Sequence, residues 1–126
     1  MALGHRKWCI PDMYMVENDP NRDTPSHETV CFFNGGENTA NVAITLYFEE
    51  DEEENYGERN IKLEIAPHSS THFRMDKYEV QGYAIPRNTS YSAIINSTEN
   101  IVVEYARLNW IDGLMQSFAI IPYYEE

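Results

Sequence analysis

Alternation of apolar and polar residues with a period of two is the feature that most constrains this chain. In the segment 41–48 the apolar side chains of one face are Val42, Ile44, Leu46 and Phe48. The segment 61–65 repeats the pattern with Ile61, Leu63 and Ile65. Because successive side chains of a strand point to opposite faces of a sheet, this spacing predicts strands with one buried face.

Further short apolar segments extend the prediction to about seven strands. The predicted strands cover residues 30–33, 41–48, 61–65, 71–75, 91–95, 101–107 and 115–121. Residues 98–100 are predicted to form the turn of a hairpin, and residues 11–28, rich in Pro, Asp and Asn, a long irregular loop. Since no segment has a helical period of useful length, we expect an all-β fold: an antiparallel, jelly-roll-like β-sandwich of about seven to eight strands.

The chain length of 126 residues predicts a single domain over residues 1–126, and 42 % hydrophobic residues exclude disorder of the whole chain. Pro11 and Asp12 interrupt the N-terminal segment before an apolar stretch of signal-peptide length develops. No apolar run is long enough to span a membrane, so we expect a cytoplasmic protein. Cys9 and Cys31 form no C-x-x-C pattern, and we expect reduced thiols.

A net charge of −12, from nine basic and 21 acidic residues, opposes broad contact with nucleic acid or anionic lipid. DNA binding would need a basic patch that oligomerisation assembles from residues such as Arg6, Lys7 and Arg87. Half of the net charge lies in the run Glu49–Glu54, in which every residue is acidic. Consecutive carboxylates lack the spacing of a calcium loop, so a solvated hairpin tip is predicted.

The segment Ser26-His27-Glu28 leads from the predicted loop into a strand. A strand would place Ser26 and Glu28 on one face and His27 on the other, so a serine–histidine nucleophile pair is not predicted. Two interpretations stay open: Glu28 lines a polar ligand pocket, or it forms a structural pair with an arginine. Arg107 is the natural partner, because it continues an apolar strand face where an unpaired guanidinium would be costly.

Four other residues have both a ligand-binding and a structural interpretation. His72 and Arg74 share a strand face and could present donors to an anionic or polyol ligand, or could simply be solvated. Trp8 and Tyr14 could stack on a sugar ring, or could anchor the core or an interface.

No metal or cofactor is expected. Only His68 and His72 are four residues apart, a spacing that converges on a helix and not in a turn followed by a strand. At the C-terminus the apolar residues Phe118, Ile120 and Ile121 fall on both faces of the predicted strand. Apolar residues on both faces favour burial at a subunit interface.

Three segments together resemble the bacterial sensory rhodopsin transducer family. Residues 26–34, SHETVCFFN, resemble the signature S-H-E-T-x-C-x-x-N; residues 101–108, IVVEYARL, are similar to I-V-V-x-x-x-R-L; and residues 8–14, WCIPDMY, match W-x-I-x-acid-G-Y. Met13 stands in place of the glycine of the third motif, and Val16 in place of a following proline.

This resemblance implies a β-sandwich subunit in a homo-tetramer. It also implies a soluble transducer for a membrane photoreceptor or other signalling protein, or a module that binds sugars or related metabolites. The candidate ligand-binding residues are Ser26, His27, Glu28, His72, Arg74, Arg107, Trp8 and Tyr14. The alternative is an enzyme for a small polar or sugar-like substrate, which would need Glu28, His27, His72 and Arg74 in one cleft.

Overall fold

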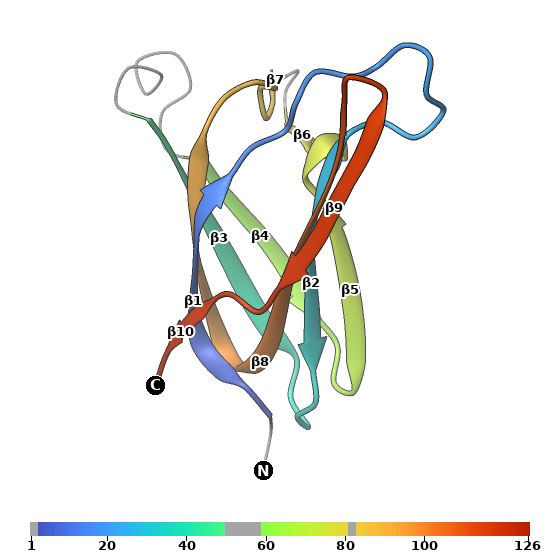
Figure 1. The fold of residues 1–126 in the computed structure, drawn as a ribbon. Coiled ribbons are helices and arrows are strands. Elements are labelled where there is room, and N and C mark those ends of the chain that lie inside the picture. Colours follow the sequence, from blue (N-terminus) through green and yellow to red (C-terminus); the bar gives the residue numbers. More distant parts are fainter. Residues whose placement is uncertain (1–2, 50–58, 81–82) are drawn as a thin grey trace.

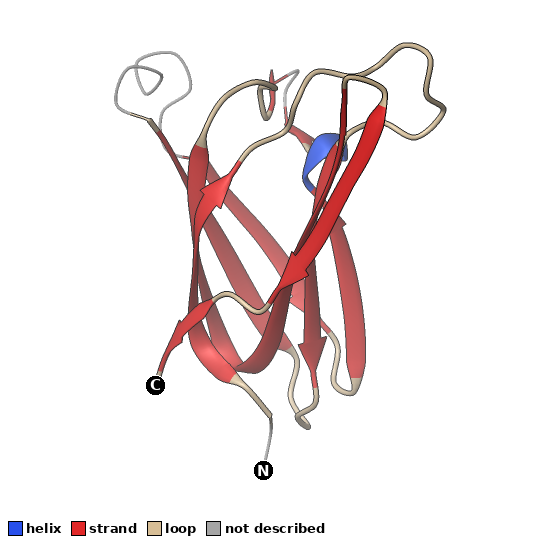
Figure 2. Ribbon diagram, in the orientation of Figure 1, coloured by secondary structure: helices blue, strands red, loops and turns tan. Residues whose placement is uncertain are grey.

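The computed structural model describes residues 3–49, 59–80 and 83–126 (Figure 1). Within them the elements are β1 (His5–Met13), β2 (His27–Asn34), β3 (Ala40–Phe48), β4 (Arg59–Ile65), β5 (Ser69–Arg74), the 3-10 turn η1 (Met75–Lys77), β6 (Glu79–Val80), β7 (Tyr83–Ala84), β8 (Tyr91–Ile111), β9 (Leu114–Ile120) and β10 (Tyr123–Glu125). Figure 2 shows that strands dominate. The prediction of an all-β, antiparallel fold is confirmed, and the arrangement is consistent with a β-sandwich.

The long strand β8 connects two sets of strands. Its N-terminal half pairs with β1 and β3, which in turn pair with β10 and β4. Its C-terminal half pairs with β2 and β9, and β2 also pairs with β5. All these pairings are antiparallel, and the N- and C-terminal ends of the chain lie at the same end of the molecule (Figure 1).

The hairpin predicted around residues 98–100 is wrong, because β8 continues through this segment. No residue between 96 and 100 has a positive φ, so the backbone stays extended where β8 changes partners from β1 and β3 to β2. The reversal comes at Asp112 (φ 51°) and Gly113 (φ 76°), which separate the paired residues Ile111 and Leu114. Two positive φ values in a two-residue loop are typical of a type I′ hairpin turn.

The core lies between the two sets of strands and follows the predicted alternation. Val42, Ile44 and Leu46 of β3 are at most 2 % exposed, and Ile61 and Ile65 of β4 pack into the same cluster. The predicted faces of both strands are therefore confirmed. The acidic run between them lies outside the described residues, apart from Glu49.

Two boundaries differ from the prediction. The segment 11–28 begins in a strand, because β1 runs to Met13 and buries Trp8 and Ile10. Its pairing with β8 shifts register between Ile10 and Met13, where Pro11 can donate no backbone hydrogen bond. The second difference is the predicted strand 71–75, which ends one residue earlier, at Arg74, because Met75 begins the 3-10 turn.

No helix in the described part of the chain is long and apolar enough to cross a membrane.

Candidate functional site

Glu28 is a fully buried carboxylate at the centre of a polar network. Its Oε1 accepts a hydrogen bond of 2.5 Å from the Tyr91 hydroxyl, and its Oε2 accepts one from the Tyr105 hydroxyl and one of 2.9 Å from the Tyr14 backbone N–H. In the register of β2 and β8, Glu28 lies opposite Arg107, whose Nε is 3.8 Å from Glu28 Oε2. The predicted pairing of Glu28 with Arg107 is therefore present.

Arg107 connects this network to two further strands. Its Nε donates to the Tyr105 hydroxyl (2.9 Å) and its Nη2 to the backbone carbonyl of Asp12 (3.2 Å). Its guanidinium lies 5.3 Å from the ring centroid of Phe118 on β9. Since the same residues link β1, β2, β8 and β9, the geometry favours the structural interpretation of the pair.

Burial governs the protonation of the network. It raises the pKa of Glu28 above its ordinary value of 4.5, against the opposing effect of the hydrogen bonds from Tyr105 and Tyr91. Burial and the neighbouring Glu28 raise the pKa of both Tyr91 and Tyr105. Both hydroxyls therefore stay protonated and act as donors to the Glu28 carboxyl group.

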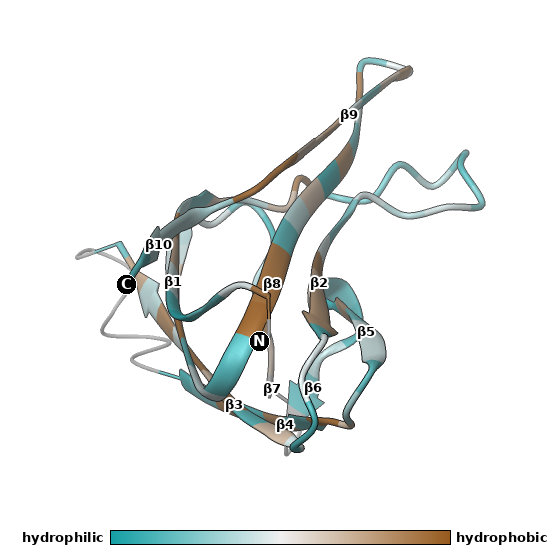
Figure 3. Ribbon diagram, turned by 90° about the horizontal axis from the view of Figure 1, so that it is seen from below, coloured by the Kyte–Doolittle hydropathy of each residue, from teal (hydrophilic) through white to brown (hydrophobic). Residues whose placement is uncertain are grey.

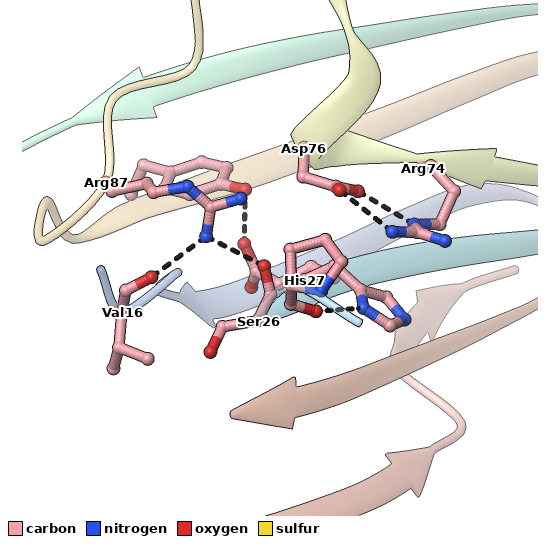
Figure 4. Close-up of polar contacts among 9 residues, drawn as sticks. Val16, Ser26, His27, Arg74, Asp76 and Arg87 are labelled. Carbon is pink, nitrogen blue, oxygen red and sulfur yellow. Dashed lines mark hydrogen bonds and ion pairs between the residues drawn. The ribbon is translucent and has the colours of Figure 1, made fainter. Parts of the chain in front are cut away.

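Ser26 is also buried, and it fixes the long loop to β8. Its Oγ accepts a hydrogen bond of 3.0 Å from the Trp110 backbone N–H. Its carbonyl accepts from Arg87 Nη1 (2.7 Å), which also donates to the carbonyl of Val16 (2.9 Å) (Figure 4). A serine with these contacts holds the chain and is not exposed to a ligand, so its assignment as a ligand-binding residue is not supported.

His27 and Arg74 each have a partner close in sequence. His27 Nδ1 lies 2.8 Å from the carbonyl of Pro25. Arg74 makes a double hydrogen bond to Asp76, at 2.7 Å from Nε and 2.8 Å from Nη2 (Figure 4). His72 and Arg74 share a strand face as predicted, but the Arg74 guanidinium is bound to Asp76, which favours a structural role for Arg74.

The four residues of the enzyme alternative do not converge. Glu28 points into the sandwich, whereas His27 alternates onto the opposite face of β2. The register of β2 with β5 places Arg74 opposite Thr29 and His72 opposite Cys31, so these two side chains also lie on the outer face. A shared cleft is excluded because the sheet separates Glu28 from the other three.

Trp8 belongs to the core and not to a sugar-stacking surface. It is 2 % exposed, its Nε1 donates to the His5 carbonyl (3.0 Å), and its ring lies 5.3 Å from that of Tyr124. The Tyr124 ring in turn stacks on His5 at 3.9 Å, which fastens β10 to β1. The interpretation of Trp8 as an anchor is correct, and Tyr14 contributes its backbone N–H to Glu28.

Within the described residues, two surfaces near the Glu28 network and β9 are candidates for contact with partners. The first is a groove of about 380 Å³ over β2, β8 and β9, lined by His27, Thr29, Ala106, Arg107, Leu108, Ser117, Phe118 and Ala119. The second, here called the β9–β10 apolar surface, consists of Leu114, Met115, Phe118, Ile120, Ile121 and Tyr123, which are 44–68 % exposed. Exposed apolar side chains gathered on one strand and its extension are typical of a protein–protein contact.

Among the described residues, no group of three His, Cys, Asp or Glu side chains could hold a metal ion. The donors that surround Glu28 are hydroxyl, guanidinium and backbone N–H groups. Such a set stabilises a carboxylate and offers no ligands to a cation.

A sequence model of the Anabaena sensory rhodopsin transducer family matches residues 3–124. The chain belongs to this family. The structure is similar to the crystal structure of Thermotoga maritima 1070, with a TM-score of 0.83 and 32% sequence identity over 98% of this chain and 97% of that chain. It is also similar to the Anabaena sensory rhodopsin transducer, with a TM-score of 0.69 and 26% identity over 83% of this chain and 89% of that one. A comparison with curated proteins gives no match.

Membership of the transducer family confirms the resemblance found in the three sequence segments. Sequence reasoning nevertheless missed three residues of the polar network and its surroundings. Tyr105 could have been found, since it lies on the same strand face as Arg107, two residues away. Tyr91 and Arg87 gave no such signal, because their contacts join segments far apart in the chain.

Proposed function

We propose that this chain is a single-domain, non-catalytic, signal-transducer-like protein that acts through contact with other proteins. The observation that carries the proposal is the β9–β10 apolar surface, an exposed contact area on a molecule whose buried Glu28 and Ser26 are engaged in structural bonds. The transducer function of the Anabaena relative supports it. The partner would be a membrane photoreceptor or another signalling protein, met in the cytoplasm.

The proposed working form is a homo-oligomer, specifically a homo-tetramer. Leaving the β9–β10 apolar surface in water is unfavourable, whereas covering it with protein would bury several large side chains at roughly 25 cal/mol per Å². The family resemblance, which implies a tetramer, supports the same assembly.

Direct binding tests the transducer function. A rhodopsin encoded by the same genome is placed in lipid nanodiscs and titrated with the purified protein by biolayer interferometry, with empty nanodiscs as the control. Saturable binding to the loaded nanodiscs alone is expected. Equal signals from loaded and empty nanodiscs would contradict a photoreceptor partner, and the neighbouring genes would then indicate which signalling protein to examine.

A second candidate function is the binding of a small polar ligand, such as a sugar, in the groove over β2, β8 and β9. The groove combines the polar residues His27, Thr29 and Ser117 with the apolar Leu108. Such a mixture suits a ligand that has both hydroxyl groups and apolar faces.

A thermal-shift screen with sugars and sugar acids at millimolar concentration tests this ligand class. Binding near saturation should raise the melting temperature by about 2 °C or more. The shift should disappear in His27→Ala and persist in His72→Ala, whose side chain lies outside the groove. A flat response of the unmodified protein to every sugar would count against the candidate.

A further inference from the structure

A pocket of about 320 Å³ lies where the ends of β1 and β3 flank the start of β8. Its lining includes Asp12 of β1, Tyr47 of β3 and Glu49, which follows β3. This pocket, here called the Asp12–Glu49 pocket, lies at the end of the molecule opposite the two termini (Figure 1). The β8–β9 hairpin extends away from β1 and β3 (Figure 3), so the pocket is separate from the β9–β10 apolar surface.

The Asp12–Glu49 pocket combines two carboxylates with an accessible aromatic ring. β1 and β3 pair with β8 from its two sides, so Asp12 and Glu49 belong to different walls. Between them Tyr47 lies opposite Ser92 in the register of β3 with β8 and is 43 % exposed. No Lys or Arg is among the lining residues. Within the described part of the chain, neither carboxylate forms an ion pair or accepts a hydrogen bond.

Hydrogen bonds of the surrounding backbone hold the walls of this pocket in place. The Ser92 hydroxyl donates to the Pro11 carbonyl at 2.7 Å, which ties the start of β8 to the end of β1. The Asp12 carbonyl accepts from Arg107 Nη2 at 3.2 Å. The charge of Arg107 also acts on the Asp12 carboxylate, but it is shared with the buried Glu28. Because the site is preformed, a ligand that enters it loses less free energy to ordering of the protein.

This lining is complementary to a cation on a flexible stem. Carboxylates pair with ammonium and guanidinium groups, and the face of a tyrosine ring attracts the same groups. Arg59 of β4 already makes such a contact nearby, 5.9 Å from the ring centroid of Phe48, without being one of the lining residues. The volume lies at the small end of the range for ligand pockets and suits a single long side chain better than a folded element.

The charge of the whole molecule indicates where such a side chain comes from. With a net charge of −12 the protein is repelled by anionic lipid and attracted to basic protein segments. The loops that membrane proteins expose on their cytoplasmic side carry an excess of Lys and Arg. We propose that the Asp12–Glu49 pocket receives a lysine or arginine side chain from a basic cytoplasmic segment of a membrane protein. This inference rests on the proposed transducer function and assigns one of its contact sites.

A short basic peptide locates the site. The wild-type protein is titrated at low salt with acetyl-Gly-Arg-Arg-Gly-amide, and its amide resonances are followed by NMR. Saturable shifts are expected at Asp12, Tyr47 and Ser92. The matched peptide with citrulline in place of both arginines has nearly the same shape without the charge and should give no shifts. Shifts that avoid these three residues, or that the citrulline peptide reproduces, would overturn the inference.

Two double variants test the site with the protein partner. Asp12→Asn/Glu49→Gln should bind nanodiscs loaded with the rhodopsin of the same genome about tenfold more weakly than the wild type. Glu64→Gln/Glu79→Gln removes two exposed carboxylates elsewhere, reaches the same net charge, and should weaken binding less than about twofold. Circular dichroism establishes that both variants are folded.

The outcomes separate this inference from the transducer function. Equal weakening by the two double variants, or wild-type affinity of Asp12→Asn/Glu49→Gln, would overturn the pocket while the transducer function stands. A wild-type protein that binds the arginine peptide at the pocket but ignores the loaded nanodiscs would instead contradict the photoreceptor partner and support the preference of the pocket for basic segments.

Discussion

The Glu28–Arg107 pair is the single contact whose loss should cost the most stability. Arg107→Ala leaves the buried Glu28 carboxylate without its cation and removes a donor from the Tyr105 hydroxyl. We expect a loss of roughly 2–4 kcal/mol in the free energy of unfolding, measured by urea denaturation. Arg6→Ala is the control. The Arg6 side chain is 63 % exposed and forms an ion pair with Glu99, so this substitution should lower the free energy of unfolding by less than about 0.5 kcal/mol. Equal effects of the two substitutions would contradict the network.

Because the pKa of Glu28 is raised in the folded protein, the stability of the fold should change with pH in a defined direction. Glu28 holds its proton to higher pH in the folded protein than in the unfolded chain, where the pKa is near 4.5. Above that pH the folded state binds more protons, so the stability contributed by Glu28 falls as pH rises through the raised pKa. Glu28→Gln should therefore gain stability relative to wild type as pH rises above about 4.5, as measured by thermal melts. A relative loss over this range would refute the assignment.

Part of the polar network around Glu28 could be predicted from the sequence alone. The alternation of β2 and β8 places Glu28 and Arg107 on inward faces, and the cost of an unpaired guanidinium joins them. The same reasoning did not identify the partner of Arg74, because Asp76 lies just beyond the strand, in a 3-10 turn that the alternation does not predict. It also could not place Tyr91, which reaches Glu28 only once β8 is one continuous strand.

The turn of the β8–β9 hairpin depends on Gly113. At φ 76° this residue adopts a left-handed conformation, while an added Cβ would meet only Arg22 Nη2, at 3.7 Å. The cost of Gly113→Ala therefore comes from the backbone, and we expect about 1–2 kcal/mol in thermal or urea unfolding. Asp112→Asn, at φ 51°, should be nearly neutral because asparagine tolerates this conformation. The turn assignment would be refuted by an alanine variant as stable as wild type.

The long loop between β1 and β2 depends on Arg87. In Arg87→Ala the carbonyls of Val16 and Ser26 lose their shared donor, so the loop should open more often. We expect trypsin to cleave after Arg22, within this loop, about tenfold faster than in the wild type. Arg6→Ala, which removes an exposed cation elsewhere, should leave the rate unchanged. Unaltered cleavage of Arg87→Ala would show that other contacts hold the loop.

The strands could be predicted where alternation was strong and uninterrupted, as in β3 and β4. Strand β1 was missed because it begins with His5, Arg6 and Lys7 and contains Pro11, residues that resemble a loop in composition. The polar segment within β8 was interpreted as a turn for the same reason. Composition alone cannot distinguish a chain reversal from an extended crossing between two sets of strands, since that difference lies in φ and in strand pairing.

Charge sets how copies of the protein approach one another. Because each copy carries −12, forming the proposed homo-oligomer brings several acidic molecules together. Raising NaCl from about 0.1 M to about 1 M shortens the screening length from about 10 Å to about 3 Å and should strengthen the assembly. Sedimentation equilibrium at both salt concentrations gives the dissociation constants. Weaker association at high salt would indicate that ion pairs, and not apolar contact, hold the subunits together.

The mass of the wild-type protein in solution tests the proposed homo-oligomer most directly. Multi-angle light scattering at micromolar concentration should give four times the 14.7 kDa of one chain. Dilution should lower this mass without unfolding the protein, because each subunit has its own core. A constant mass of 14.7 kDa at all concentrations would contradict the account, since the β9–β10 apolar surface would then stay exposed without a second copy to cover it.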